Sequence, residues 1–316
     1  AGERFGAAIA MHLDLLVIGA PGAGGGIGAV RVYRFGGSAW VLEATLVPLD
    51  GRPGDGFGES IAVLGDRVAV GLPGRDDHGP DTGAVDLFRH GAGGWVHERR
   101  FECVDSIDAY GDSCVDGPGG DRFGEIVALA DPHLIVAEPG RGIERGLYAP
   151  GSFSQFRFRN PQYAGALGRI GHPTGTVHPG EAEFPSTLAT DGDTLLIGLP
   201  GYANDSGTLL SSTITPSGVP EADTFDPYQF GSWQGARLGE VVAVWKDVVA
   251  LWRASSSNDD NVQIIDPRTG SYPYYSIACP DPSDADDFGR MLALGPDVLL
   301  AGRPRPPGCC SVPPCD

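Results

Sequence analysis

The chain of 316 residues has a formal net charge of −19 and contains 49 glycines and 27 prolines. A surface this acidic repels phosphate backbones, which argues against nucleic acid as a partner, and no apolar run in the sequence is long enough to cross a membrane. The many turn-forming residues, without a collagen-like period, predict an all-β fold of short strands.

A repeat with a constant first half runs along the chain. A Phe-Gly pair, or a degenerate copy of it, begins near residues 5, 57, 123, 184, 238 and 288. A Gly-x-Pro triplet, or its degenerate equivalent, follows each start at an offset of 14 residues. The starts are 52, 66, 61, 54 and 50 residues apart, so the length varies in the second half of the repeat. Six equal offsets predict one structural unit that occurs six times.

Each repeat is predicted to supply four antiparallel strands, as the second copy illustrates. Its first two strands form a hairpin around a Gly-Asp turn, which suits the twist of a two-residue connection. The strands predicted in the second copy are 60–64, 67–71, 84–88 and 95–101, and the last two have counterparts at 29–35 and 40–46 in the first copy. Four short strands in each repeat are typical of the blades of a β-propeller. The glycine-rich segment 22–29 is then the loop between two strands and not a dinucleotide-binding turn.

The sixth repeat has room for only two strands. The segment 305–316 that follows Gly302-Arg303-Pro304 is too rich in proline for interior strands. We therefore expect a propeller over residues 1–305 and a Cys/Pro-rich tail over 306–316. An unpaired sheet edge invites pairing, so either another segment or chain completes the sixth blade or the tail folds back to cover it.

The order Phe-Gly, hairpin, Gly-x-Pro, Gly-x-Val-x-x-Phe and Trp-led strand resembles the FG-GAP repeat family over residues 1 to about 305. That family forms the propeller head of integrin α subunits and of many bacterial and algal surface proteins. The resemblance implies an all-β propeller of six FG-GAP blades, with four antiparallel strands per blade and an incomplete last blade. It also implies a role in cell adhesion or another form of protein binding.

Many integrin-type repeats carry a calcium loop, Asp-x-Asp-x-Asp-Gly-x-x-Asp, between their first two strands. The offset of 14 residues leaves no room for it here. The nearest approach, Asp191-Gly192-Asp193, is too short to supply the 6 to 8 oxygen ligands that calcium takes. We therefore expect a subfamily without calcium hairpin loops, and no metal or other cofactor.

The sequence favours a binding module over an enzyme. It contains neither a Gly-x-Ser-x-Gly nor a His-Glu-x-x-His motif. The leading interpretation is an extracellular, non-catalytic module for binding, adhesion or assembly. It would recognise protein or carbohydrate through the loop-rich face of the propeller, where the long connections gather. The alternative is a non-catalytic propeller domain of a larger secreted hydrolase.

Two groups of residues are candidates for ligand contact. Four aromatic residues lie in the turn-rich stretch 223–235, where exposure would suit protein or sugar contact, although they would also suit the seam between the fourth and fifth blades. Two acidic residues follow the second Gly-x-Pro, where the alternative is a solvated polar loop. The candidates are Phe225, Tyr228, Phe230 and Trp233 in the first group, and Asp76 and Asp77 in the second.

Six cysteines favour disulfides in an oxidising, extracellular compartment over a metal site, because they lack zinc-ligand spacing. We expect Cys103 to pair with Cys114 across a short loop. Cys279 would then pair with Cys309 or Cys310, and the other of these with Cys315. Asn204-Asp205-Ser206 is the one sequon for N-glycosylation that proline does not block.

Overall fold

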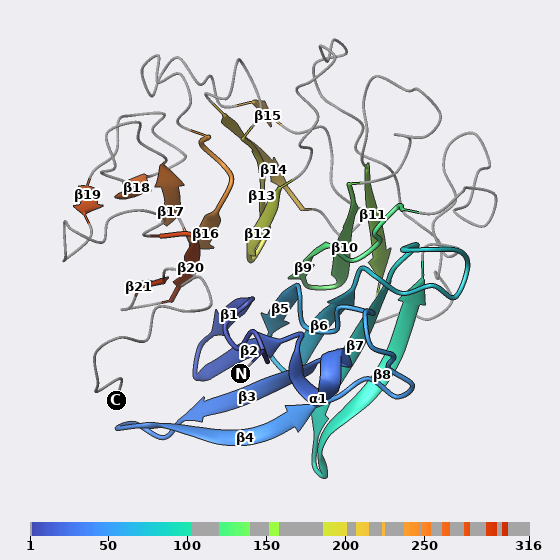
Figure 1. The fold of residues 1–316 in the computed structure, drawn as a ribbon. Coiled ribbons are helices and arrows are strands. Elements are labelled where there is room, and N and C mark those ends of the chain that lie inside the picture. Colours follow the sequence, from blue (N-terminus) through green and yellow to red (C-terminus); the bar gives the residue numbers. More distant parts are fainter. Residues whose placement is uncertain are drawn as a thin grey trace.

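The computed structural model describes most of the first two repeats and the strand-forming parts of the others. The described residues are 2–102, 120–139, 152–157, 186–200, 207–214, 223–224, 237–246, 248–253, 261–265, 275–278, 289–295 and 299–302. Their fold is all-β (Figure 1). No helix in this part of the chain is long and apolar enough to span a membrane.

The described strands form six antiparallel sheets that follow one another along the chain. The first is β1 (Ile9–His12), β2 (Leu15–Ala20), β3 (Ala29–Phe35) and β4 (Trp40–Leu46), and the second is β5 (Ile61–Leu64), β6 (Arg67–Leu72), β7 (Ala84–Gly91) and β8 (Gly94–Glu102). The third is β9 (Ile126–Ala130), β10 (His133–Glu138) and β11 (Ser152–Arg157), and the fourth is β12 (Thr187–Asp191), β13 (Thr194–Leu199), β14 (Thr208–Thr213) and β15 (Asp223–Thr224). The fifth is β16 (Val242–Trp245), β17 (Val248–Arg253), β18 (Asn261–Ile265) and β19 (Tyr275–Ala278), and the sixth is β20 (Met291–Leu294) and β21 (Leu299–Gly302).

The sheets are arranged radially around their first strands (Figure 1). These inner strands contact one another in the order β1, β5, β9, β12, β16 and β20, and β20 contacts β1. In every sheet the further strands follow outward in chain order. The described strands of the third sheet end at β11, and those of the sixth end at β21. The result is a propeller-like arrangement, in which loops and turns leave at the two ends of the strands.

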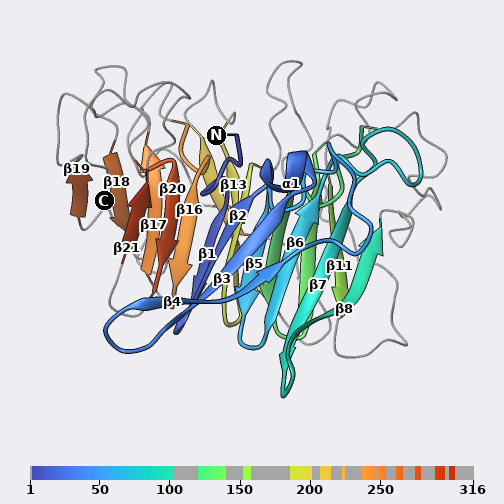
Figure 2. The same cartoon turned by 60° about the horizontal axis from the view of Figure 1, so that its bottom comes forward.

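The predicted strands of the first two repeats agree with the structure. In the first repeat, β3 and β4 have the predicted bounds. In the second repeat, β5 to β8 differ from the predicted strands by a few residues at their ends. The predicted loop 22–29 contains one short turn, α1 (Ala23–Gly26), in which Gly24 and Gly25 have φ angles of 59° and 78° and so do not continue a helix. α1 lies at one end of the first sheet, and the β3–β4 turn lies at the other (Figure 2).

Hydrogen bonding explains the constant offset of 14 residues. In the first and second repeats, the N–H of the Phe-Gly glycine donates to the carbonyl oxygen of the first Gly-x-Pro residue. Gly6 donates to Gly19 over 2.9 Å, and Gly58 donates to Gly71 over 3.2 Å. The bond closes the hairpin formed by the first two strands. A longer or shorter hairpin would break this pairing. The variation in repeat length therefore lies in the second half of the repeat.

Contact between sheets explains why the motif residues are small or aromatic. A Cβ atom on Gly19 would stand 2.1 Å from the carbonyl oxygen of Gly58 in the next sheet. Phe57, beside Gly58, is fully buried and forms a parallel bridge with Gly28. The glycines let the backbones of neighbouring sheets approach, and the phenylalanine fills the seam between them.

The core is divided among the seams between neighbouring sheets. A hydrophobic cluster of described residues joins the first sheet to the second, the second to the third, the third to the fourth, the fourth to the fifth and the fifth to the sixth. Burial of apolar area at about 25 cal/mol per Å² makes these seams the main source of stability.

Candidate functional site

The structure describes two of the six candidate ligand-binding residues, Asp76 and Asp77. The aromatic candidates Phe225, Tyr228, Phe230 and Trp233 lie outside the described residues, as do Asn204 and all six cysteines, Cys103, Cys114, Cys279, Cys309, Cys310 and Cys315. The predictions for these residues therefore remain predictions.

Asp76 and Asp77 have different roles in the loop between β6 and β7. The Asp76 side chain accepts a hydrogen bond from the backbone N–H of Asp81, with Oδ1 2.8 Å from the nitrogen, and so shapes its own loop. Asp77 accepts from Arg75 Nε at 2.6 Å and lies 3.3 Å from Arg52 Nη1. Neither carboxylate is simply solvated, because each holds part of the loop backbone or an arginine in place.

Arg75 is the centre of this arrangement. Its side chain is only 2% exposed, and three carboxylates surround its guanidinium. Besides Asp77, it donates to Asp50 Oδ2 at 2.6 Å and to Asp55 Oδ2 at 3.0 Å. Asp50 and Asp55 belong to the connection between the first and second sheets, whereas Asp77 belongs to a loop of the second sheet. Arg75 therefore ties together two connections that are separate in sequence.

Arg100 extends the network down the second sheet. It donates to Asp50 Oδ1 at 2.7 Å and makes two hydrogen bonds to Asp86, at 2.7 and 2.9 Å. The ring nitrogen Nε2 of His97 lies 3.0 Å from the same buried Asp86 carboxylate. We call Asp50, Asp55, Arg75, Asp77, Asp86 and Arg100 the charged cluster.

The electrostatics of the charged cluster favour the ionised forms of Asp50 and Asp86. Burial opposes ionisation of Asp50, but hydrogen bonds from Arg100 and Arg75 outweigh it and lower the pKa of Asp50 to about 2. Burial likewise opposes ionisation of Asp86, and contacts with His97 and Arg100 outweigh it, so the Asp86 pKa lies below its usual value. Opposite charges at this distance favour the charged forms. The cluster is thus a set of fixed ion pairs and not a reactive acid–base pair.

Sequence reasoning missed most of the charged cluster. It selected Asp77 from a run of acidic residues, but it did not connect that residue with Asp50, Asp55 or Arg100. The available signal was Arg75, which directly precedes the acidic pair in the loop after Gly-x-Pro. An arginine between a buried strand and two carboxylates indicates an internal ion pair.

Two exposed aliphatic residues lie beside the charged cluster. Leu49 is 74% exposed and Val47 is 56% exposed, and both belong to the same connection as Asp50. This connection and the β6–β7 loop leave the sheets at the same end, because the strands alternate in direction. A hydrogen bond from Gly74 N to Asp55 O, 3.1 Å long, joins the two connections. Leu49 and Val47 are therefore presented on the loop-rich face.

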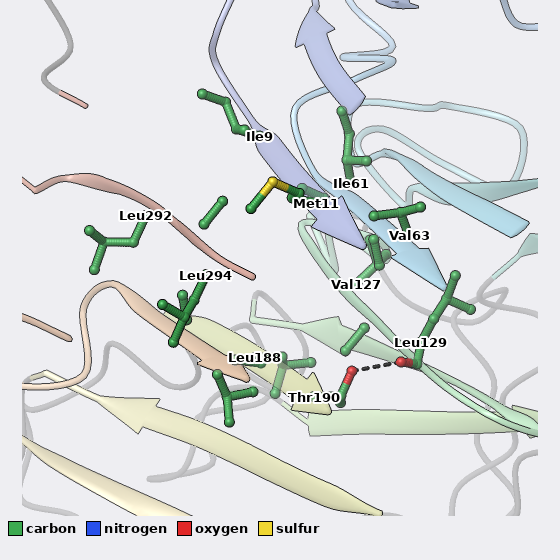
Figure 3. Close-up of a pocket in the computed structure, with 17 residues that line it drawn as sticks. Ile9, Met11, Ile61, Val63, Val127, Leu129, Leu188, Thr190, Leu292 and Leu294 are labelled. Carbon is green, nitrogen blue, oxygen red and sulfur yellow. Dashed lines mark hydrogen bonds between the residues drawn. The ribbon is translucent and has the colours of Figure 1, made fainter. Parts of the chain in front are cut away.

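A cavity of 130 Å³, to which many aliphatic residues contribute, lies where the inner strands meet (Figure 3). Residues from all six inner strands line it, among them Met11, Val63, Leu129 and Leu294. Thr190 places a hydroxyl at the cavity wall, where it donates to the carbonyl oxygen of Leu129 over 2.6 Å. That hydroxyl therefore already has a hydrogen-bond partner within the wall.

Polar residues lie at the ends of the strands that line this cavity. His12 ends β1, Asp191 ends β12 and Trp245 ends β16, and the rings of His12 and Trp245 are 6.3 Å apart. His12 Nδ1 accepts from the backbone N–H of Gly65 at 3.2 Å. Burial lowers the pKa of His12, against the opposing charges of Asp191 and Asp14. Among the described residues, no group of three or more His, Cys, Asp or Glu side chains is placed to hold a metal ion.

Comparisons with known proteins bear on the repeat and on the fold. No curated protein matches the chain in sequence. Among solved structures, hydrazine synthase of Kuenenia stuttgartiensis is similar with a TM-score of 0.48 and 13% identity, over 86% of this chain and 65% of that one. A prolyl endopeptidase is similar with a TM-score of 0.44 and 11% identity, over 84% of this chain and 33% of that one. The chain thus spans less than two thirds of either protein, and likenesses of this degree carry no argument about function.

The sequence motif is more specific. The family model described as the FG-GAP repeat matches residues 40–88. This span runs from β4, through the Phe-Gly pair at Phe57 and the triplet at Gly71, to the middle of β7. The chain therefore contains an FG-GAP repeat, which together with its all-β, propeller-like fold is consistent with an FG-GAP repeat propeller family.

Proposed function

We propose that this chain is a six-bladed FG-GAP propeller that acts as an extracellular, non-catalytic binding module. We propose further that its loop-rich face binds a protein. Six cysteines support an oxidising location, and the recurrence of the repeat at six positions supports the number of blades. The FG-GAP resemblance supports a role in adhesion or assembly.

The observation that carries the proposal is a rigid loop that presents apolar side chains. Arg75 and its three carboxylates fix the connection that contains Leu49 and Val47. A partner would therefore bind a surface that is already ordered, which reduces the entropic cost of association. Leu49 directly precedes Asp50 of the charged cluster, and apolar side chains beside polar ones are the usual anatomy of a protein interface.

Protein is favoured over carbohydrate by the chemistry of this surface. Leu49 and Val47 are aliphatic, and they offer neither the flat aromatic face nor the array of free polar groups that would suit a sugar ring. The carboxylates beside them are engaged with Arg75 and Arg100. The loop surface is thus suited to an apolar side chain of a partner protein.

The test compares Leu49→Ser with Val96→Ser. Val96 is 48% exposed on β8, near the turn at the opposite end of the second sheet, and serves as the matched control. Proteins from the extracellular fluid of the source organism are captured on the wild-type chain and identified. Their affinities for the purified variants are then measured by calorimetry.

A residue at the centre of an interface contributes about 2 kcal/mol or more, which is roughly a 30-fold change in Kd. We expect a loss of this size for Leu49→Ser and less than a twofold change for Val96→Ser. Equal affinities for the two variants, or binding to a glycan array without any protein ligand, would refute the proposal.

A further inference from the structure

The seam between the sixth and first sheets differs from the five seams that hydrophobic clusters fill. Phe57 and Phe123, the Phe-Gly aromatics of the second and third repeats, have no exposed surface. Phe5 occupies the same place in the first repeat, next to the sixth sheet, and is 47% exposed. No cluster of described residues joins these two sheets. We call this region the 6–1 seam.

The glycine of each Phe-Gly pair shows what the 6–1 seam lacks. A Cβ atom on Gly58 would meet Val30 Cγ2 at 3.1 Å, and one on Gly124 would meet Val85 Cγ2 at 2.8 Å. Both valines belong to the third strand of the preceding sheet. A Cβ atom on Gly6 would meet nothing within 4 Å. Among the described residues, none takes the place of a third strand of the sixth sheet beside Gly6.

The second strands show the same difference over a larger area. In β2, Leu16 and Ile18 point toward the 6–1 seam and are only partly buried. Their counterparts in the next four sheets point toward the preceding sheet and are almost completely buried. These counterparts are Val68, Val70, Leu134, Val136, Leu195, Ile197 and Val249, each 0% exposed, and Leu251, 1% exposed. One face of the first sheet thus carries apolar side chains that the described residues cover less completely than in the next four sheets.

The fourth strands extend this pattern to the edge of the blade. Trp95 of the second sheet donates from Nε1 to Glu43 Oε1, 2.7 Å away on the fourth strand of the first sheet. Trp40 holds the same position in the first sheet and is 38% exposed, and its ring lies 5.2 Å from the tilted ring of Phe35 in its own sheet. The described part of the chain therefore supplies no equivalent of a fourth strand at the 6–1 seam.

We propose that a β-hairpin of another polypeptide chain binds in the 6–1 seam as the third and fourth strands of the sixth sheet. Its first strand pairs antiparallel with β21, as β3 pairs with β2. It begins with glycine followed by two small or branched apolar residues, as do the segments that start at Gly28 and Gly83. That glycine bridges to Phe5, and the second strand carries a carboxylate that accepts from Trp40 Nε1.

Two other occupants fit less well. The segment 303–316, which follows β21 and includes the tail, contains five prolines, and proline cannot donate to a ladder. A second copy of the chain would have to release a hairpin such as β3–β4, which is already paired with β2. Addition of strands from a separate chain needs no such release and uses main-chain hydrogen bonds for affinity.

A synthetic peptide with the sequence of residues 28–46 provides the probe, because it carries the Gly-Ala-Val start and Glu43 in one hairpin. We expect saturable, one-to-one binding of the labelled peptide by fluorescence anisotropy. We also expect slower hydrogen exchange at β21, the strand that gains a partner, with exchange of β3 unchanged. A control peptide with Val32→Pro removes one ladder donor and should bind at least tenfold more weakly.

Protein variants locate the site. Phe5→Glu places a charge in the 6–1 seam at an exposed position, so it should fold and should weaken peptide binding at least tenfold. Ile18→Glu is a second variant at the same surface, and Val96→Glu is the control, with less than a twofold effect. Absence of saturable binding, equal binding by the control peptide or by Phe5→Glu, or a homodimer that excludes the peptide would each overturn the proposal. None of these experiments involves Leu49. Failure of the hairpin proposal would therefore not decide the proposed function, which the comparison of Leu49→Ser with Val96→Ser tests.

Discussion

Gly71 lies so close to the next sheet that a Cβ atom added to it would stand 2.0 Å from the carbonyl oxygen of Gly124. The hydroxyl of Ser60 also donates to this oxygen, over 2.6 Å. At this point the two sheets therefore meet through backbone and a single small side chain. This contact joins the Gly-x-Pro motif of one repeat to the Phe-Gly motif of the next.

The first prediction is that Gly71→Ala separates these sheets and destabilises the protein. Overpacking of a tight interior contact costs about 1–3 kcal/mol, and a backbone neighbour relaxes less easily than a side chain. Urea denaturation measures the free energy of unfolding. Gly93→Ala is the control, since a Cβ atom there meets nothing within 4 Å and its φ is not positive. Equal stability of the two variants would contradict the close contact.

The second prediction compares two residues that hold the same position in successive repeats. Phe57 is fully buried, so Phe57→Ala should lower the free energy of unfolding by about 3–5 kcal/mol through lost burial and a residual cavity. Phe5 is 47% exposed, so Phe5→Ala should cost about 0.5 kcal/mol. Parallel thermal and urea denaturation of the isolated chain tests both. A large loss from Phe5→Ala would mean that the 6–1 seam is closed.

The third prediction concerns the charged cluster. Arg75→Ala leaves the buried carboxylate of Asp55 without its arginine and should cost about 3–5 kcal/mol. Arg52→Ala is the control, because the Arg52 side chain is 59% exposed and its ion pair with Asp77 is therefore weakened by solvent. Denaturation at neutral pH measures both changes. If Arg75→Ala lowered the free energy of unfolding no more than Arg52→Ala, the charged cluster would not hold the loops together.

The fourth prediction is a loss of stability in acid. The folded-state pKa of Asp50 is about 2, below its ordinary value of 3.8, and that of Asp86 is also lowered. The unfolded chain therefore binds more protons than the folded chain between these pH values. The stabilisation is present above about pH 4 and is lost as the pH falls toward 2.

Urea denaturation at a series of pH values between 2 and 5 checks this dependence. Asp50→Asn should reduce the slope of the free energy of unfolding against pH, because one of the shifted carboxyls is removed. An unchanged slope in Asp50→Asn would show that Asp50 does not contribute to it.

The sequence by itself determined the repeated hairpins. The offset of 14 residues reflects hydrogen bonds within one repeat, such as that from Gly58 to Gly71, and the strands alternate over a few residues. The spacing of glycines and apolar residues is therefore enough to predict this local register. For the same reason, the bounds of β3 and β4 and the existence of β5–β8 could be predicted without coordinates.

Only the tertiary structure decided the candidate sites. Asp50, Asp55 and Arg75 meet because the connection between two sheets lies over a loop of the second sheet, and no sequence spacing encodes that approach. The exposure of Phe5 depends likewise on which strands stand opposite it. Its Phe-Gly motif is the same as that of Phe57, yet one side chain is buried and the other is open. Hydrogen-bonded register is a property of neighbouring residues, whereas burial and ion pairing depend on the packing of segments distant in the chain.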